Sequence, residues 1–410
     1  MNDFSIPTPT ARTAFAASLF DGDLPTDWAI GVMDDVLSGT EYGLSEPGDS
    51  AGDTSIVGMR DLVDGVVRFE ELATVDSGGT DWSAFRLRRG DILLNRTNSP
   101  DLVGKVGYVR EDFDAVFASY LVRLHVDPQR ADAEYVAAWL TSDIAQRALK
   151  RLSTRGVSQA NINPTEFRRH CPIPIPPLPE QRKIAEILRT WDKALEKLTA
   201  LRVAKAQRLD GLAARLIHDE QAERLHLRDF LSEVSTRNHG QQVERVLSVT
   251  NSAGFVLAED QFAHRVASAD LSNYKIVRRG QYAYNPSRIN VGSIARLDAW
   301  EDGALSPMYV VFRVRNGLDS DFFRHWLRSA EARQRIALAA QGSVRETVSF
   351  GDLGSILIPV PTIERQQSIS RALNAGREEI ALIEAEIEAL TRQKRGLMQK
   401  LLTGEWRVSP

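Results

Sequence analysis

The chain has 410 residues and a formal net charge of −4, with 43% hydrophobic and 26% charged residues. This composition is typical of a soluble globular protein of two to four domains, and the acidic balance argues against a protein that coats nucleic acid without regard to sequence. A single cysteine, Cys171, excludes an internal disulfide and a thiolate zinc cluster, so the sequence predicts a reducing, cytoplasmic setting.

Residues 1–20 form an N-terminal extension whose role the sequence does not indicate. The extension has no basic region leading into a long apolar core. No stretch of the chain approaches the ~18 uninterrupted apolar residues that suggest a membrane span.

Residues 21–179 are expected to form a first α+β domain with a curved β-sheet. Short runs rich in β-branched residues are separated by Gly and Asp turns and are followed by one amphipathic helix around Trp139. The runs are VVRFEEL (66–72), DILLN (91–95), KVGYV (105–109) and YLVRLHV (120–126).

A proline string, PIPIPPLPEQ (172–181), leads from this domain into a long helix predicted over residues 180–219. Apolar residues then recur with the 4-3 spacing of a coiled coil. Arg202 and Lys205 interrupt the series, as polar residues that set the register often do. The apolar positions are Ile184, Leu188, Trp191, Leu195, Leu198, Leu209, Leu212 and Leu216.

The same plan follows a second time. Residues 220–360 are expected to form a second α+β domain around Trp326, residues 361–403 a second long helix and residues 404–410 a tail. Gly376 and Lys394 interrupt the second helix. Its predicted seam residues are Ile369, Leu373, Ile380, Ile383, Ile387, Leu390, Leu397 and Leu401.

A shift of 185 residues superimposes the two copies. It places Pro174-Ile175-Pro176 on Pro359-Val360-Pro361, and with small gaps Trp139 falls on Trp326. Because a proline string fixes the direction in which the chain leaves a domain, two such strings give two domains the same orientation on matching helices. Each helix is predicted to have roughly 33 residues, about 50 Å. Paired helices of this kind would hold two similar domains at a set separation, which suggests a target with two parts.

Several strings also resemble a known family. They are LLNRTNSPDLVGKVGYV (93–109), RGVSQANINPTEF (155–167), PIPPLPEQRKIAEIL (174–188) and the tail LMQKLLTGEWRV (397–408). They resemble the specificity subunit of type I restriction–modification systems, over nearly the whole chain.

The resemblance implies a DNA-recognition subunit that is not itself an enzyme. Each globular half would be a target recognition domain that reads one half of a bipartite DNA site. The helices would form an antiparallel coiled coil that sets the spacer and docks two methylation subunits. Those partners would carry S-adenosylmethionine and methylate adenine at N6, and a motor-nuclease subunit using ATP and Mg would join them. Leu201, Ala381 and Leu382 lie off the predicted seam, where a partner could cover them.

Polar loops in the first half are the candidates for DNA contact, because base edges are read by Arg, Lys, Asn, Gln and Ser side chains. Residues 95–98 are equally compatible with an ordinary turn. Residues 155–161 could instead have a structural role within the domain, and Ser119 and Tyr120 could pack against other residues of the domain. Arg60 could form an ion pair with Asp61 or Asp64. The candidates are Arg60, Asn95, Arg96, Thr97, Asn98, Lys105, Ser119, Tyr120, Arg155, Ser158, Gln159 and Asn161.

In the second half, the equivalent loops are YNPSRIN (284–290) and AQGSVRETV (340–348). The second loop departs from the Ser-Gln-Asn pattern of the first copy. The DNA-contact role inferred for residues 155–161 therefore applies less directly to residues 340–348. The candidates are Tyr284, Asn285, Ser287, Arg288, Asn290, Gln341, Ser343 and Arg345.

Enzymatic interpretations are weak. GDSAG (48–52) fits G-x-S-x-G around Ser50, but the nucleophile elbow requires a preceding strand and a following helix, and Pro47 precedes it here. YNPS lacks the rest of an adenine-methyltransferase signature. The sequence contains no G-x-x-x-x-G-K-[ST] and no H-E-x-x-H motif, so neither a nucleotide loop nor a catalytic metal site is expected. A stand-alone DNA-binding or scaffold protein remains the alternative.

Overall fold

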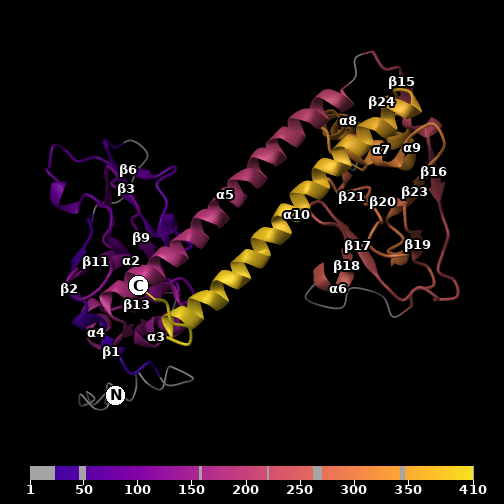
Figure 1. Ribbon diagram of the computed structural model, residues 1–410. Helices are drawn as coiled ribbons and strands as arrows, with labels where there is room; N and C mark the ends of the chain where they lie inside the picture. The colour runs from indigo at the N-terminus through magenta and orange to yellow at the C-terminus, as the bar shows by residue number, and fades with distance from the viewer. Residues whose placement is uncertain are drawn as a thin grey trace. The chain divides into compact units, whose positions relative to one another are not determined.

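The computed structural model describes residues 24–45, 52–156, 159–218, 221–261, 270–341 and 347–409. The predicted N-terminal extension, residues 1–20, and Ser50 lie outside this part of the chain. Two compact units are present: unit 1 comprises Met1–Leu198 with Glu386–Pro410, and unit 2 comprises Thr199–Ala385. Each unit joins a globular part to portions of two long helices (Figure 1).

The central sheet of unit 1 has six strands in the order β2-β11-β7-β9-β5-β4. Its first four strands pair antiparallel, and β5 pairs parallel with β9. A second sheet has the order β10-β3-β6. The bounds are β2 Leu37–Tyr42, β3 Thr54–Val57, β4 Leu62–Val63, β5 Val66–Val67, β6 Ala73–Val75, β7 Ile92–Asn95, β9 Val106–Tyr108, β10 Ala115–Phe117 and β11 Leu121–Val126.

Helices cover this sheet and shorter strands complete the unit. Asp132 caps the first helix, because its carboxylate accepts a hydrogen bond from the Tyr135 N–H. Strand β1, Ala29–Val32, pairs with β14, Pro172–Ile175, and a further sheet contains β12 Ser153–Arg155, β13 Ala160–Ile162 and β8 Thr97–Asn98. The helices are α2 Ala133–Thr141, α3 Asp143–Leu152 and α4 Pro164–His170. The 3-10 turns are η1 Met33–Asp35, η2 Met59–Asp61 and η3 Ser83–Phe85.

Unit 2 has its own four-stranded sheet in the order β16-β23-β20-β21 and three two-stranded sheets, β15-β24, β17-β18 and β19-β22. The bounds are β15 Arg224–His226, β16 Leu231–Val234, β17 Leu247–Thr250, β18 Gly254–Leu257, β19 Lys275–Arg278, β20 Tyr282–Tyr284, β21 Ile294–Arg296, β22 Asp302–Leu305, β23 Val310–Val314, β24 Leu357–Pro359, α6 Ala258–Gln261, α7 Ser320–Leu327, α8 Ala330–Gln341, α9 Phe350–Gly354, η4 Leu227–Asp229 and η5 Ile289–Val291.

The two units repeat one topology. The order β16-β23-β20-β21 matches β2-β11-β7-β9, and the pair β15-β24 matches β1-β14. The helix pair α7 and α8 follows β23 as α2 and α3 follow β11. Trp139 and Trp326, aligned from sequence, are both fully buried in the cores of their units. The predicted α+β class and internal repeat are therefore confirmed.

The long helices are α5, Leu178–Ile217, and α10, Ile363–Leu402. Each has 40 residues, close to the predicted bounds, whereas the heptad seam covers roughly 33, because each helix begins before its first seam residue. Pro179 fits the first turn of α5, where no intrahelical donor is required.

Opposite ends of the two helices meet, so they pair antiparallel as predicted. In unit 1, Lys394 forms an ion pair with Asp192. In unit 2, Lys205 pairs with Glu379 at 2.6 Å and Arg202 with Glu384 at 3.4 Å. Three of the polar residues that interrupt the heptads therefore join one helix to the other.

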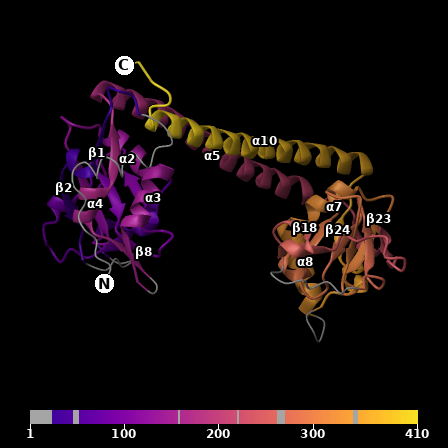
Figure 2. The same cartoon turned by 90° about the horizontal axis from the view of Figure 1, so that it is seen from below.

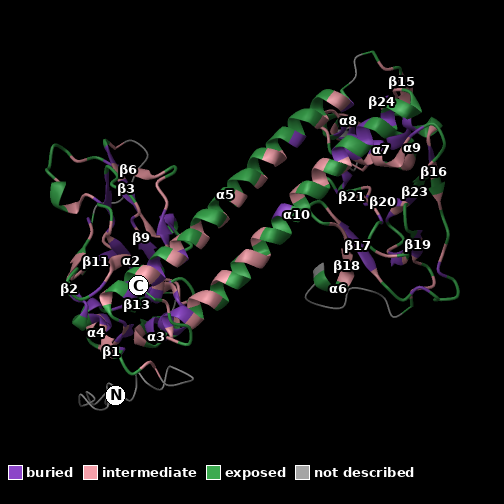
Figure 3. Ribbon diagram, in the orientation of Figure 1, coloured by how far each residue is buried: buried purple, intermediate pink, exposed green. Residues whose placement is uncertain are grey.

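Most predicted seam residues are buried or half-buried (Figure 3). Leu212 is an exception, with 40% of its surface exposed. Ala213 and Ile217 pack into the core of unit 2 instead. The buried stripe shifts here because the end of α5 faces the globular part of the unit as well as α10. None of the described helices is long and apolar enough to cross a membrane.

Candidate nucleic-acid interface

Two loops that are far apart in the sequence meet in unit 1. Strand β8 pairs with β13, with Thr97 opposite Asn161 and Asn98 opposite Ala160, and β12 pairs with the other side of β13. The Thr97 hydroxyl donates a hydrogen bond to Asn161 Oδ1 over 3.2 Å. Figure 2 shows β8 at the end of unit 1 that lies away from α5.

We call this region the β8 edge and define it as Tyr42, Arg96, Thr97, Asn98, Tyr120 and Asn161. Strand register brings its members together, because Tyr42 lies opposite Val122 and Leu121 lies opposite Asn95 at the same end of the sheet. Tyr42 and Tyr120 are 48% and 37% exposed. Asn161 is also exposed, whereas Arg96, Thr97 and Asn98 are half-buried.

Arg96 is held firmly at this edge. Its N–H donates to the Tyr120 carbonyl over 3.0 Å, and its own carbonyl accepts from the Ile162 N–H over 2.8 Å. Its guanidinium carbon lies 5.1 Å from the centroid of the Tyr42 ring. No carboxylate in the described ranges pairs with Arg96, and its Nε is buried without a hydrogen-bond partner there.

Asn95 is placed differently from its neighbours. Its side chain is fully buried, and neither Oδ1 nor Nδ2 has a partner among the residues that the structure describes. A polar group in this state is costly to bury. Asn95 is therefore part of the domain interior beneath the β8 edge, not a group displayed at its surface.

The other candidates of unit 1 are spread more widely. Lys105, Gln159 and Tyr120 are exposed, whereas Ser119 is half-buried. Arg60 lies in η2, where its guanidinium approaches Asp61 at 3.4 Å and donates to the Glu71 carbonyl, so the ion pair considered from sequence is present. Ser158 and the side chain of Arg155 lie outside the described part of the structure.

Unit 2 builds the equivalent edge with other residues. The Val348 N–H donates to the Pro286 carbonyl over 3.0 Å, the counterpart of the Ile162–Arg96 bond in unit 1. Ser287, Arg288 and Asn290 are exposed in this segment. Gln341 ends α8, but its side chain, Ser343 and Arg345 lie outside the described residues.

Tyr284 and Asn285 are not displayed at this edge. Tyr284 is fully buried and its hydroxyl donates to the Val348 carbonyl over 3.2 Å. Burial raises the pKa of Tyr284 well above its usual range. Asn285 is 8% exposed, and its Oδ1 accepts from the Ser287 N–H. Both side chains are buried beneath the loop and support its conformation.

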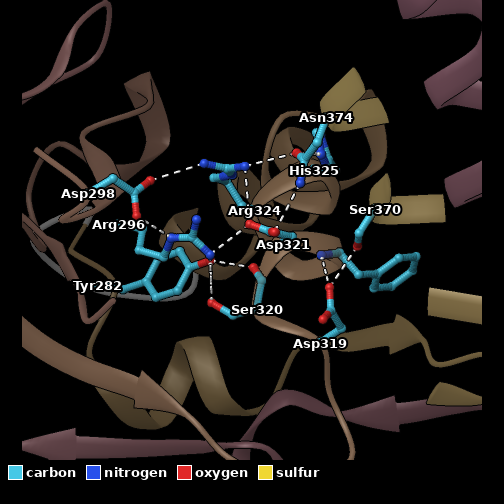
Figure 4. A network of polar contacts seen from close by, with 11 residues as sticks. Tyr282, Arg296, Asp298, Asp319, Ser320, Asp321, Arg324, His325, Ser370 and Asn374 are labelled. Carbon is cyan, nitrogen blue, oxygen red and sulfur yellow. Dashed lines mark hydrogen bonds and ion pairs between the residues drawn. The ribbon is translucent and has the colours of Figure 1, made fainter. Parts of the chain in front are cut away.

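A separate polar network joins α7 to α10 in unit 2 (Figure 4). Arg296 and Arg324 each pair with both Asp298 and Asp321, at 2.7 to 3.1 Å. Burial opposes ionisation of Asp321, but the two guanidinium groups hold its pKa below the usual value. Asn374 accepts from Arg324 and from the ring of His325. This network braces the globular part against its helix.

Tyr42 was not predicted as a site residue. Its strand, β2, was not among the runs predicted from the sequence, and its contact with Arg96, the residue after β7, reaches across β11 in the sheet. The sequence signal that could have identified Tyr42 is an aromatic residue directly before a glycine, Gly43, at the end of a strand. Among the described residues, no group of three or more His, Cys, Asp or Glu residues is arranged to hold a metal ion.

The chain is similar to several known proteins. Residues 47–205 match a family model described as the type I restriction modification DNA specificity domain. A putative type I restriction enzyme MjaX specificity subunit from Methanocaldococcus jannaschii is 24% identical, over 94% of this chain and 95% of that protein. The type I restriction enzyme EcoBI specificity subunit of Escherichia coli is 23% identical over 194 residues, 45% of this chain and 40% of that protein.

The fold has a solved counterpart. The crystal structure of a type I restriction–modification S subunit from M. genitalium aligns with a TM-score of 0.59 and 16% identity, covering 93% of this chain and 97% of that one. Together these findings confirm the resemblance stated from sequence and the predicted fold class.

Proposed function

We propose that this chain, a member of the type I specificity-subunit family, reads a bipartite DNA site, with each globular half on one half-site. The family match makes it a DNA-recognition component and not an enzyme in its own right.

One observation carries the proposal. The same edge of a repeated fold bears Arg96, Thr97 and Asn98 in unit 1 and Ser287, Arg288 and Asn290 in unit 2. Side chains of these types form the hydrogen bonds that distinguish base pairs in the major groove. Because the scaffold is shared and the displayed residues differ, the two halves should recognise different sequences.

Lys105 and Gln159 complete the proposed contact set beside the edge of unit 1, and Arg60 in η2 is a separate proposed contact. Exposed cations such as Lys105 suit phosphate contacts, which fix position on the duplex without carrying sequence information. We assign a structural role, not a DNA contact, to the buried residues Tyr284, Asn285 and Asn95, which lie beneath the loops.

The helices would set the spacer between half-sites and dock two methylation subunits. Leu201 and Leu382 are 43% and 70% exposed on α5 and α10, and Ala381 is exposed beside Leu382. Apolar side chains left uncovered on a helix are suited to a partner surface. S-adenosylmethionine and adenine N6 methylation would belong to these partners, and ATP and Mg to a motor-nuclease subunit. The complex would act on DNA in the cytoplasm.

The experiment is co-expression with the neighbouring methylation subunit in a methylation-free host, followed by long-read mapping of modified adenines. A bipartite motif with a fixed unspecified gap is expected. Replacing residues 220–355 with those of a relative should change one half of the motif only. A stable complex that produces no methylation motif would favour the stand-alone DNA-binding or scaffold function instead.

A further inference from the structure

We propose that Arg96, held against the ring of Tyr42, reads a guanine in the half-site recognised by unit 1. This inference rests on the proposed function. It assigns a guanine to Arg96 and a positioning role to Tyr42, which was not predicted as a site residue from the sequence.

The first argument is the unpaired charge of Arg96. Several other partly buried arginines of unit 1 have carboxylate partners: Arg110 pairs with Asp192 at 2.9 Å, and Arg189 with Glu134 at 2.9 Å. No described carboxylate pairs with Arg96, and its Nε is buried without a partner. A guanidinium without a carboxylate partner keeps its charge available for an acceptor on another molecule, such as a base edge or a phosphate.

The second argument is the way the side chain is fixed. The Arg96 backbone is bonded on both sides, to Tyr120 and to Ile162. The Tyr42 ring, 5.1 Å from the guanidinium carbon, restrains the plane of the side chain by a cation–π contact. A planar group held in one orientation loses little conformational entropy when it binds, and it presents two parallel N–H donors in a fixed direction.

The third argument is the chemistry around the guanidinium. Its neighbours at the β8 edge are Thr97, Asn98 and Asn161, which are neutral, whereas phosphate sites gather several cations or backbone N–H groups. Guanine presents O6 and N7 as two adjacent acceptors in the major groove, and arginine matches them with two hydrogen bonds. Lys105, whose carbonyl accepts from the Asn95 N–H, is the exposed cation assigned above to phosphate, whereas the oriented and unpaired Arg96 has neutral neighbours within the β8 edge and fits a base edge.

Tyr42 acts through Arg96 in this scheme and is a positioning residue. Its hydroxyl is not required for the cation–π contact, whereas its ring is. Tyr42→Phe should therefore preserve the readout and Tyr42→Ala should weaken it, at the same base pair that Arg96 reads.

The test uses the complete complex with its methylation subunits. The half-site read by unit 1 is the half that does not change when residues 220–355 are replaced. Methylation motifs are then mapped for Arg96→Ala, Arg96→Lys, Tyr42→Phe and Tyr42→Ala. Arg88→Ala is the control, because it removes an exposed cation of the same unit outside the β8 edge. Thermal melts identify any variant that fails to fold.

We expect Arg96→Ala and Arg96→Lys to relax the preference for one G·C pair in that half-site by roughly tenfold or more, with the remaining positions unchanged. In binding assays, 7-deazaguanine at this position, which lacks the N7 acceptor, should weaken the wild-type complex and leave the Arg96→Ala complex unaffected. Tyr42→Phe and Arg88→Ala should behave as wild type.

Two results would overturn the inference while leaving the proposed function intact. One is a uniform loss of affinity for all sequences in Arg96→Ala, with a salt dependence reduced by about one charge, which identifies a phosphate contact. The other is an unchanged motif. If the wild-type complex itself lacks a bipartite motif, the proposed function fails first, and the inference fails with it.

Discussion

Gln366 and Asp319 are joined by a hydrogen bond of 2.7 Å from the Asp319 N–H to the Gln366 side-chain oxygen. The Gln366 amide also donates to the carbonyls of Pro361 and Gly317. Gln181 repeats this arrangement in unit 1, where it accepts from the Asp132 N–H over 2.9 Å and donates to the Pro176 carbonyl over 2.8 Å. The glutamine after each proline string thus ties the first turn of a long helix to the capping residue of a domain helix.

Replacing Gln366 with alanine should destabilise unit 2. The change removes three partly buried hydrogen bonds, so a loss of about 1–3 kcal/mol in the free energy of unfolding is expected. Gln367→Ala is the matched control, since the adjacent glutamine is exposed. Urea unfolding of both variants measures the difference. Equal stability of the two variants would show that the joint is not held by Gln366.

These glutamines illustrate how much of the fold the sequence could predict. The repeated proline strings, the 185-residue shift and the heptads identified the two domains, the helices and their order. Such features are local or periodic, so they can be read from one chain. The hydrogen bond from the Asp132 N–H to the Gln181 side-chain oxygen joins residues 49 positions apart, and neither residue type identifies its partner.

The candidate site was predictable only in part, for the same reason. Polar loops at residues 95–98 and 155–161 were identified, but their meeting at the β12–β13–β8 sheet depends on long-range pairing. Tyr284 and Asn95 occur in polar loops and yet are fully buried, because each lies at the inner end of a core strand. Tyr42 was missed because its role arises from a contact with Arg96, which is distant in the sequence.

Removing Arg407 should loosen the C-terminal tail of unit 1. Its guanidinium binds Asp27 at 2.7 Å and Glu180 at 2.8 Å, and Glu180 also accepts from the Trp28 indole N–H. Arg407→Ala leaves the buried Glu180 carboxylate without its cation, so the melting temperature should fall at pH 7. Arg395→Ala, which removes an exposed arginine of α10 in the same unit, provides the control.

This effect should depend on pH. Burial disfavours the charged carboxylate, but the hydrogen bonds from Arg407 and Trp28 hold the pKa of Glu180 below its usual value. A depressed carboxylate pKa contributes stability above the unfolded-state value and loses it as the pH falls through the folded-state value. The difference between wild type and Arg407→Ala should therefore shrink below about pH 4. A difference that is constant from pH 7 to pH 3 would exclude this origin.

His325 predicts a second pH dependence, in unit 2. Burial lowers the pKa of its ring to about 4, and the neighbouring Arg324, Arg328 and Arg377 add to the effect, whereas the hydrogen bond with Asn374 opposes it. The unfolded chain takes up the proton first, near pH 6.5, so stability is fully present above that pH and falls as the pH decreases. We expect a loss of about 2 kcal/mol between pH 7.5 and pH 5.

Two variants isolate this contribution. His325→Gln cannot titrate in this range and should lose most of the pH dependence of urea unfolding between pH 7.5 and pH 5. His239→Gln is the control, because His239 is exposed in the same unit. If both variants keep the wild-type pH profile, the charge on His325 is not linked to folding.

The exposed leucines of the long helices test the docking proposal. Leu382 is 70% exposed, so Leu382→Glu should change the free energy of unfolding by less than about 0.5 kcal/mol. At a docking surface the same change places a charge against an apolar partner, and co-purification of the methylation subunit should fall at least tenfold. Leu338→Glu makes the identical change at a 60% exposed leucine of α8 and should have no effect. Normal assembly by both Leu382→Glu and Leu201→Glu would place the methylation subunits elsewhere on the chain.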